Sequence, residues 1–297
     1  MSAEERVAVA PIKVRSVMTK SNLPIAGYSV NPYVGCTHGC KYCYACFMKR
    51  FTGHGEAWGS FLDVKYWDAP KDPRRYAGCT VIVGSVTDPY LPQEEEYRRT
   101  RAFLEEMKGS GINLIIVTKS DLVLRDLDLI ASYPSPLICW SVNTLDEDFR
   151  KDMDGAVAIE RRIAAMKKCH EQGLRTTCFV SPIFPGITDV FAIIDRIKGF
   201  CDYIWLENLN LRGNFKAGIM EYIKEKRPGL LPLYRDIYDR RDRTYWHMLD
   251  ENVREYAQRE GMLYVIDKEP FMRSADGSPV IINYFYHSEI KQSAKKK

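Results

Sequence analysis

The sequence predicts an α/β fold: an open (β/α)6 partial TIM barrel, followed by a C-terminal extension with helices and a β-hairpin. Short apolar runs alternate with longer segments of helical spacing between residues 79 and 209. The runs are nearly continuous in apolar residues, which is typical of parallel strands buried on both faces. Polar side chains follow the ends of the runs, where parallel α/β folds gather their reactive groups.

The strands and helices of the core are predicted from this alternation. Residues 1–26 have no period and are interrupted by Pro11 and Pro24, so we expect irregular structure there. Strands are expected at 28–34, 79–86, 112–119, 136–143, 174–182 and 202–209, and helices at 44–51, 94–108, 122–132, 156–173 and about 188–200. Each helical segment follows a strand, which indicates a parallel sheet with helices outside it.

The last third of the chain has a different pattern. Residues 214–260 are helical in spacing and rich in charge, and the segments 262–267 and 280–287 are β-like with the turn SADGSP between them. We expect the two β-like segments to form a hairpin or an added edge strand. The predicted division is an N-terminal extension at 1–27, a core at 28–212 and a C-terminal extension with a basic tail at 213–297.

The composition is that of an ordinary globular protein, with 45% hydrophobic and 28% charged residues among 297. The net charge of +4 equals the contribution of Lys291, Lys295, Lys296 and Lys297, so the preceding residues are formally neutral. The first residues do not resemble a signal peptide, and no apolar run reaches transmembrane length. Nine cysteines then indicate a reducing compartment, and we expect a cytoplasmic protein without membrane contact.

Four of the cysteines fall in the segment NPYVGCTHGCKYCYACFM, at Cys36, Cys40, Cys43 and Cys46. This spacing is typical of ligands to an inorganic centre. Zinc would normally require a second, separate pair of ligands, and a closed cluster would use Cys46 as a fourth thiolate. The third hypothesis is an iron–sulfur cluster held by Cys36, Cys40 and Cys43 alone. The spacing alone leaves these three hypotheses open; the family resemblance described below favours the third, in which Cys46 packs nearby without binding the cluster.

Polar residues also follow the other predicted strands, which indicates a pocket at one edge of the sheet. They are Ser85, Thr87 and Asp88; Thr118, Lys119 and Ser120; Ser141, Asn143 and Thr144; Ser181; and Glu207 and Asn208. Any one of them could cap a helix, but together they surround the expected barrel mouth. Lys119 directly follows the apolar run LIIVT, and a partly buried ammonium group requires an anion.

The spacing C-x3-C-x2-C, with Tyr42 before the last cysteine, resembles the signature of radical S-adenosylmethionine (SAM) enzymes. The blocks SVTDPY, VTKSDLVLRDLDLI, SVNTLDEDFR and VSPIFPGITD resemble the spore photoproduct lyase-like branch of that superfamily, over roughly residues 28–210. The resemblance implies that Cys36, Cys40 and Cys43 bind a [4Fe-4S] cluster. It further implies that Ser85, Lys119 and Ser141 bind SAM, that Tyr42 lies beside the cluster and that Tyr44 matches a tyrosine of the lyase. Gly84 stands where the lyase has its hydrogen-donating cysteine.

The implied activity is reductive cleavage of SAM to a 5′-deoxyadenosyl radical, which abstracts hydrogen from a substrate. An electron donor such as flavodoxin or ferredoxin would be the partner. Nucleic acid is the substrate we favour, because of the branch and of the basic–aromatic stretches at 74–76 and 97–101. The alternatives are modification of a peptide, or a non-catalytic iron–sulfur or zinc protein with four thiolate ligands.

Overall fold

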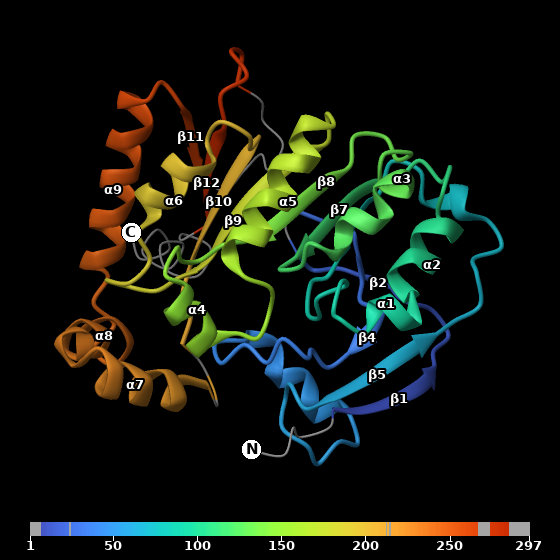
Figure 1. Cartoon of the computed structure of the whole chain (residues 1–297), viewed down its shortest axis with the longest axis horizontal. Helices are drawn as coiled ribbons and strands as arrows, with labels where there is room; N and C mark the ends of the chain where they lie inside the picture. The colour runs from blue at the N-terminus through green and yellow to red at the C-terminus, as the bar shows by residue number, and fades with distance from the viewer. Residues whose placement is uncertain (1–6, 24, 212, 214, 267–273, 285–297) are drawn as a thin grey trace, which may run out of the picture.

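The centre of the molecule is a mostly parallel β-sheet with helices packed along it (Figure 1). The computed structural model describes residues 7–23, 25–211, 213, 215–266 and 274–284. Within these residues the strand order is β11-β12-β10-β9-β8-β7-β6-β3-β2. The predicted lysine tail and the end of the β-like segment 280–287 lie outside the described residues.

The predicted core strands are all present and lie side by side. They are β3 (Tyr28–Val30), β6 (Thr80–Val83), β7 (Asn113–Thr118), β8 (Leu137–Ser141), β9 (Arg175–Ile183) and β10 (Tyr203–Asn208). Each is parallel to the next, as expected for apolar runs that are buried on both faces. The α/β class and the parallel order are therefore confirmed, and the predicted boundaries at 27/28 and 212/213 stay predictions.

The helices follow the predicted order, although two of them are interrupted. They are η1 (Tyr44–Phe51), η2 (Pro73–Tyr76), α1 (Glu94–Tyr97), α2 (Arg99–Glu106), η3 (Leu122–Asp126), α3 (Leu127–Ile130), α4 (Glu147–Met153), α5 (Ile159–Glu171), α6 (Val190–Ile197), α7 (Phe215–Lys226), η4 (Pro228–Leu230), α8 (Leu231–Tyr238) and α9 (Thr244–Arg259). The predicted helix 94–108 breaks at Arg98, which is left-handed with φ 49°. The buried carboxylate of Glu94 accepts hydrogen bonds from the backbone N–H groups of Thr100 and Arg101, and these bonds stabilise the start of α2. No described helix is long and apolar enough to cross a membrane.

The prediction of irregular structure at residues 1–26 is wrong. β1 (Ala8–Lys13) pairs with β5 (Phe61–Tyr66), and β4 (Tyr33–Val34) lies on the other side of β5 in a second, small sheet (Figure 1). β2 (Met18–Lys20) pairs with β3 at the edge of the large sheet. The expected strand 28–34 therefore divides between two sheets. Since the partner of β1 is about 50 residues away, no local pattern indicated that pairing.

Of the two expectations for the C-terminal β-like segments, the hairpin is wrong, whereas β11 is an added edge strand of the large sheet. β12 (Val280–Asn283) lies between β10 and β11 (Leu263–Ile266), and it is parallel to both. The large sheet therefore continues in parallel beyond the six predicted strands. A strand in this central position is buried on both faces, and all four residues of β12 are buried. The apolar run VII is explained by burial in the sheet interior.

We expect β12 to contribute to the core. Ile282→Ala removes a side chain that is 0% exposed, and it should lower the free energy of unfolding by about 2–5 kcal/mol. Ile266→Ala on β11, where the side chain is 40% exposed, is the matched control and should have a much smaller effect. Urea denaturation of both variants measures the difference. Equal losses would contradict a central position for β12.

Candidate active site

The cysteine segment forms a series of tight turns between β4 and η1. The N–H of Gly39 donates to the carbonyl of Cys36, and the N–H of Cys43 donates to the carbonyl of Cys40, both at 3.1 Å. Gly39 has φ 57°, a conformation that favours glycine. Cys36 is buried, whereas Cys40, Cys43 and Cys46 are half-buried, and all four are free thiols. One loop therefore carries the three cysteines that are predicted to bind the cluster, and Cys46 follows them on η1.

The protein around these thiols keeps them protonated. Burial raises the pKa of Cys36 and Cys43, and it raises that of Cys40 to about 12 although Lys119 acts in the opposite direction. Iron binds the thiolate, so metal binding would release these protons. Among the described residues, no three His, Cys, Asp or Glu side chains converge as a single metal ion requires. The assignment of a cluster therefore depends on spacing and family.

The buried carboxylate of Asp88 anchors this loop to the sheet. Its Oδ2 lies 3.1 Å from Nε2 of His38, which is 3% exposed and belongs to the cysteine loop. Asp88 also accepts from Oγ1 of Thr118 at 2.7 Å and from the backbone N–H of Lys119 at 2.6 Å. Burial alone would raise the pKa of Asp88, but His38 and these donors lower it to about 2. Asp88 thus holds the cysteine loop against the ends of β6 and β7.

Lys119 extends from the end of β7 toward the cysteine loop. Its Nζ lies 5.8 Å from the ring centre of Tyr42, and it forms no ion pair with any described residue. Burial lowers the pKa of Lys119, but the proximity of Cys40 and Asp154 raises it by more. Lys119 is therefore a half-buried cation that faces the cysteine loop.

Tyr42 is fixed by a buried ion pair. Its hydroxyl donates to Oδ2 of Asp154 at 2.9 Å, and Oδ1 of Asp154 lies 2.8 Å from Nη2 of Arg162. The side chains of Asp154 and Arg162 are fully buried. Burial raises the pKa of the Tyr42 phenol well above its usual value. Tyr42 is thereby a neutral, rigid side chain between two of the predicted ligands.

Ser85 and Tyr44 lie together at the end of β6. Nδ2 of Asn31 donates to Oγ of Ser85 at 3.0 Å, while Oδ1 of Asn31 accepts from the N–H of Val86 at 2.9 Å. The hydroxyl of Tyr44 donates to the carbonyl of Ser85. Sequence reasoning missed Asn31, although it directly precedes the cysteine loop and follows β3. Its role depends on a contact with residues more than 50 positions away.

Buried polar groups without partners mark the neighbouring strand ends. Ser141 ends β8 and is 5% exposed. Two residues further on, Nδ2 of Asn143 is buried and has no hydrogen-bond partner among the described residues, and the same holds for Oγ1 of Thr87 after β6. A buried polar group without a partner is costly, and a polar ligand would remove that cost. Ser85, Lys119 and Ser141 follow three adjacent strands, so these residues fit a polar cofactor such as SAM.

Ser181 and Glu207 form a polar pair at the ends of β9 and β10. Oγ of Ser181 donates to Oε2 of Glu207 at 2.5 Å. The register between the two strands shifts at this point, and such a bulge redirects side chains. The side chain of Glu207 is accessible to solvent. The surrounding protein partly desolvates its carboxylate and so raises its pKa, whereas the hydrogen bond from Ser181 and the charge of Lys119 lower it. The pair therefore belongs to the same sheet edge as Lys119 and remains accessible.

The basic–aromatic stretch at 97–101 is engaged within the protein. Nη1 of Arg101 lies 2.8 Å from Asp126, and Nη2 lies 3.2 Å from Asp128. The guanidinium of Arg99 lies over the ring of Trp67 at 4.3 Å. In the stretch 74–76, Arg75 likewise lies over Tyr76 at 4.6 Å. Arg101 is thus neutralised within the protein, whereas Arg74 and Arg75 are exposed and form no ion pair with a described residue, so the predicted phosphate contacts stay a prediction.

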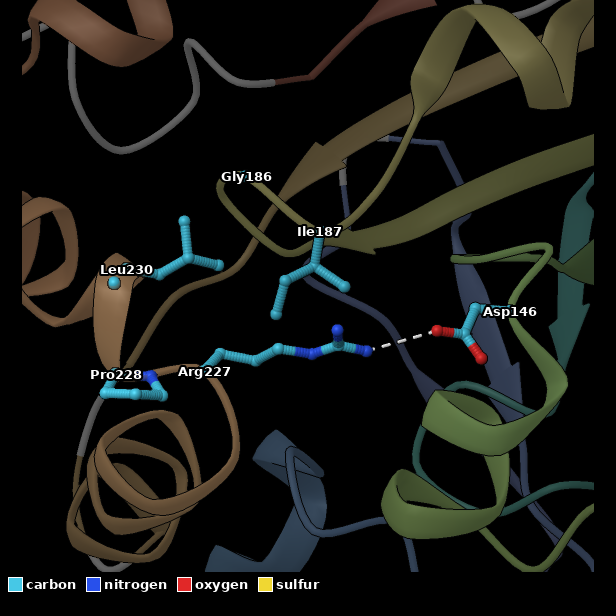
Figure 2. Close-up of a pocket in the computed structure, with 7 residues that line it drawn as sticks. Asp146, Gly186, Ile187, Arg227, Pro228 and Leu230 are labelled. Carbon is cyan, nitrogen blue, oxygen red and sulfur yellow. Dashed lines mark hydrogen bonds and ion pairs between the residues drawn. The ribbon is translucent and has the colours of Figure 1, made fainter.

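A separate cavity of about 600 Å³ lies between α4, the loop after β9 and η4 (Figure 2). Arg227 extends across it, and its Nη2 lies 3.2 Å from Oδ2 of Asp146. Gly186, Ile187 and Leu230 form its other walls. None of the predicted site residues lines this cavity.

A parallel sheet whose strand ends face a three-cysteine loop is the arrangement of an α/β enzyme with an inorganic centre. The model of the Radical SAM superfamily matches residues 30–193, which is more than half of the chain. The chain belongs to the radical SAM superfamily. Members of this family use a [4Fe-4S] cluster and SAM, so the predicted cofactors are confirmed.

Individual relatives agree with this assignment. An uncharacterized protein of Methanocaldococcus jannaschii is 34% identical over 210 residues, which cover 70% of this chain and 80% of that protein. A mutant of spore photoproduct lyase with bound AdoMet and dinucleoside spore photoproduct has a TM-score of 0.56 at 16% identity, covering 74% of this chain and 67% of the lyase. Streptococcus suis SuiB bound to S-adenosylmethionine has a TM-score of 0.53 at 14% identity, covering 95% and 51%. The predicted likeness to the lyase is therefore confirmed at the level of the fold.

Single cysteine substitutions test which thiols bind the cluster. Cys36→Ala, Cys40→Ala and Cys43→Ala should each lose most of the iron after anaerobic reconstitution, because a missing thiolate leaves the cluster underligated. Cys46→Ala is the matched control and should keep its iron. Iron and sulfide are counted per chain. Loss of iron in Cys46→Ala as well would favour the four-thiolate alternative, and retention of iron in Cys36→Ala would remove Cys36 from the ligand set.

Proposed function

We propose that this chain is a radical SAM enzyme in which Cys36, Cys40 and Cys43 hold the [4Fe-4S] cluster and Ser85, Lys119 and Ser141 bind SAM. The observation that carries the proposal is that one carboxylate, that of Asp88, contacts both His38 of the cysteine loop and the backbone N–H of Lys119. When bound, the reduced cluster and SAM supply a 5′-deoxyadenosyl radical that removes a hydrogen atom from the substrate. A small electron-transfer protein such as flavodoxin or ferredoxin would provide the electron.

The residues of this chain bind and orient the cofactors. The cation of Lys119 pairs with the carboxylate of SAM, the anion that its half-buried position requires. Tyr42, fixed by Asp154, packs its neutral ring beside the cluster and excludes water from it. The buried amide of Asn143 supplies a free donor to the ligand's polar groups.

The hydrogen relay of the lyase does not apply to this chain. Gly84 occupies the position of the lyase's hydrogen-donating cysteine, and its φ is 97°. A Cβ added here would lie 2.7 Å from Cδ of Pro89 and closer still to the carbonyl of Val117. No side chain fits at position 84 without moving the backbone. We therefore propose that the reaction differs from photoproduct cleavage in how the substrate radical is quenched.

We further propose that the substrate is a nucleic acid and that Ser181 and Glu207 contact its base. The accessible Glu207 carboxylate accepts hydrogen bonds, so it suits the amino and imino groups of a nucleobase. A base turned out of its stack, or one in a single strand, would reach the strand ends. Both a lyase with a bound dinucleoside and SuiB with a bound precursor peptide share this fold, so a peptide stays the alternative substrate.

Lys119→Met tests the SAM site. Loss of one charge-assisted contact costs about 1.5–3 kcal/mol, so SAM affinity should fall about ten- to a hundredfold. The iron content should not change, because Lys119 is not a ligand. Lys167→Met, which removes an exposed lysine from α5, is the matched control. An unchanged dissociation constant for SAM, measured anaerobically, would remove Lys119 from the site.

Glu207→Gln tests the substrate class. The reconstituted enzyme is incubated with reductant, SAM and short DNA or RNA oligonucleotides deuterated in their bases, and deuterium in 5′-deoxyadenosine is measured. We expect transfer by the unaltered enzyme and at least about tenfold less by Glu207→Gln, since one charge-assisted hydrogen bond is lost. The affinity for SAM should stay the same. A parallel loss of SAM affinity would place Glu207 in the cofactor site, and no transfer from any oligonucleotide would indicate another substrate.

A further inference from the structure

The helix that follows the third predicted ligand has an exposed face with a regular pattern. η1 is a 3₁₀-helix, in which side chains three residues apart lie directly above one another. Tyr44, Phe47 and Arg50 are spaced in this way, and all three are exposed. Phe51 follows and is 68% exposed, one of the most exposed aromatic side chains among the described residues. We call Tyr44, Phe47, Arg50 and Phe51 the η1 face.

The planar groups of the η1 face lie in a row. The rings of Tyr44 and Phe47 are stacked, with centres 6.5 Å apart and planes 29° apart. The guanidinium of Arg50 lies 5.4 Å from the ring centre of Phe47 and 4.7 Å from that of Phe51. These rings remain in water and forgo the free energy that burial in the core would provide. Exposed aromatic side chains gathered in one place indicate a binding surface.

The same face is positively charged. Arg50 carries one charge on this face, and Lys49 precedes it on η1. Neither cation forms an ion pair with a described residue; Lys49 donates to the carbonyl of Gly55 at 3.1 Å. The nearby carboxylate of Glu56 is paired with His54 at 3.1 Å. The charge of the face is therefore free to attract an anionic partner, unlike the charge of Arg101.

The η1 face begins at the proposed active site. Although Tyr44 is 57% exposed, its hydroxyl reaches the carbonyl of Ser85 at the end of β6. From there Phe47, Arg50 and Phe51 lead away along the helix. A ligand bound on this face would thus extend to the strand ends that include Glu207.

We propose that the η1 face binds single-stranded nucleic acid, stacking its bases on Phe47 and Phe51 and pairing its phosphates with Arg50. The proposal rests on the proposed function and specifies the form of its substrate. Bases stack on aromatic rings irrespective of sequence, and a cationic groove beside the rings follows the backbone. The combination of free cations and aligned rings selects a polyanion with flat groups over a neutral peptide.

The test is binding of fluorescently labelled ten-nucleotide DNA and RNA strands to the reconstituted protein with SAM, by anisotropy. Phe47→Ala and Phe51→Ala should each weaken binding about five- to a hundredfold, because one stacked base is lost. Arg50→Gln should lower the dependence of affinity on salt, and Arg50→Lys should restore it. Met248→Ala on α9 is the control and should not change binding, because the side chain of Met248 is 57% exposed, between the values of Phe47 and Phe51. Iron content and SAM affinity confirm that each variant is folded.

The outcomes separate this proposal from the proposed function. If the unaltered protein binds oligonucleotides but Phe47→Ala and Phe51→Ala bind them equally well, the proposal for the η1 face is overturned. Nucleic acid then remains the proposed substrate. If those variants bind oligonucleotides normally but are reduced more slowly by flavodoxin, the face is a docking surface for the reductant. If the unaltered protein binds no oligonucleotide at low salt, nucleic acid is overturned as the substrate, and the face with it.

Discussion

The proposed active site depends on the contacts of the buried Asp88 carboxylate. It follows β6 and accepts hydrogen bonds from the end of β7 and from the backbone N–H of Tyr90, and it also contacts His38 in the cysteine loop. A buried charge is tolerated only when donors surround it, and the lowered pKa of Asp88 shows that they do. The loop that carries the cysteines is therefore placed by the sheet rather than by its own short turns.

A second buried charge fixes the other side of the loop. Asp154 and Arg162 are fully buried and paired, and Asp154 accepts the hydroxyl hydrogen of Tyr42. A buried ion pair contributes little to net stability, because desolvation offsets most of the attraction. Its effect here is on position: it holds Tyr42 while Asp88 holds His38. Two buried carboxylates thus contact the cysteine loop, one through His38 and one through Tyr42, as a preorganised site requires.

The sequence predicted the parts of the fold and site that follow from chain order. Buried parallel strands have a recognisable pattern, and the structure places Ser85, Lys119 and Ser141 at the ends of the adjacent strands β6, β7 and β8, as chain order predicts. What it missed depends on partners far apart in the chain. β12 enters between β10 and β11, β1 pairs with β5, and Tyr42 meets Asp154 112 positions later. No local spacing encodes which of many carboxylates a given tyrosine will reach.

The charge distribution shows that the number of arginines in a stretch differs from the number of unpaired charges it presents. Arg101 lies in the most basic stretch of the core, but Asp126 and Asp128 neutralise it, and Glu94 and Asp126 do the same for Arg125. An internal ion pair contributes no field to an approaching polyanion. The cations on η1 are fewer, yet they have no acidic partner among the described residues. A nearly neutral protein can therefore present a cationic face beside its active site, provided that its acidic residues are used elsewhere.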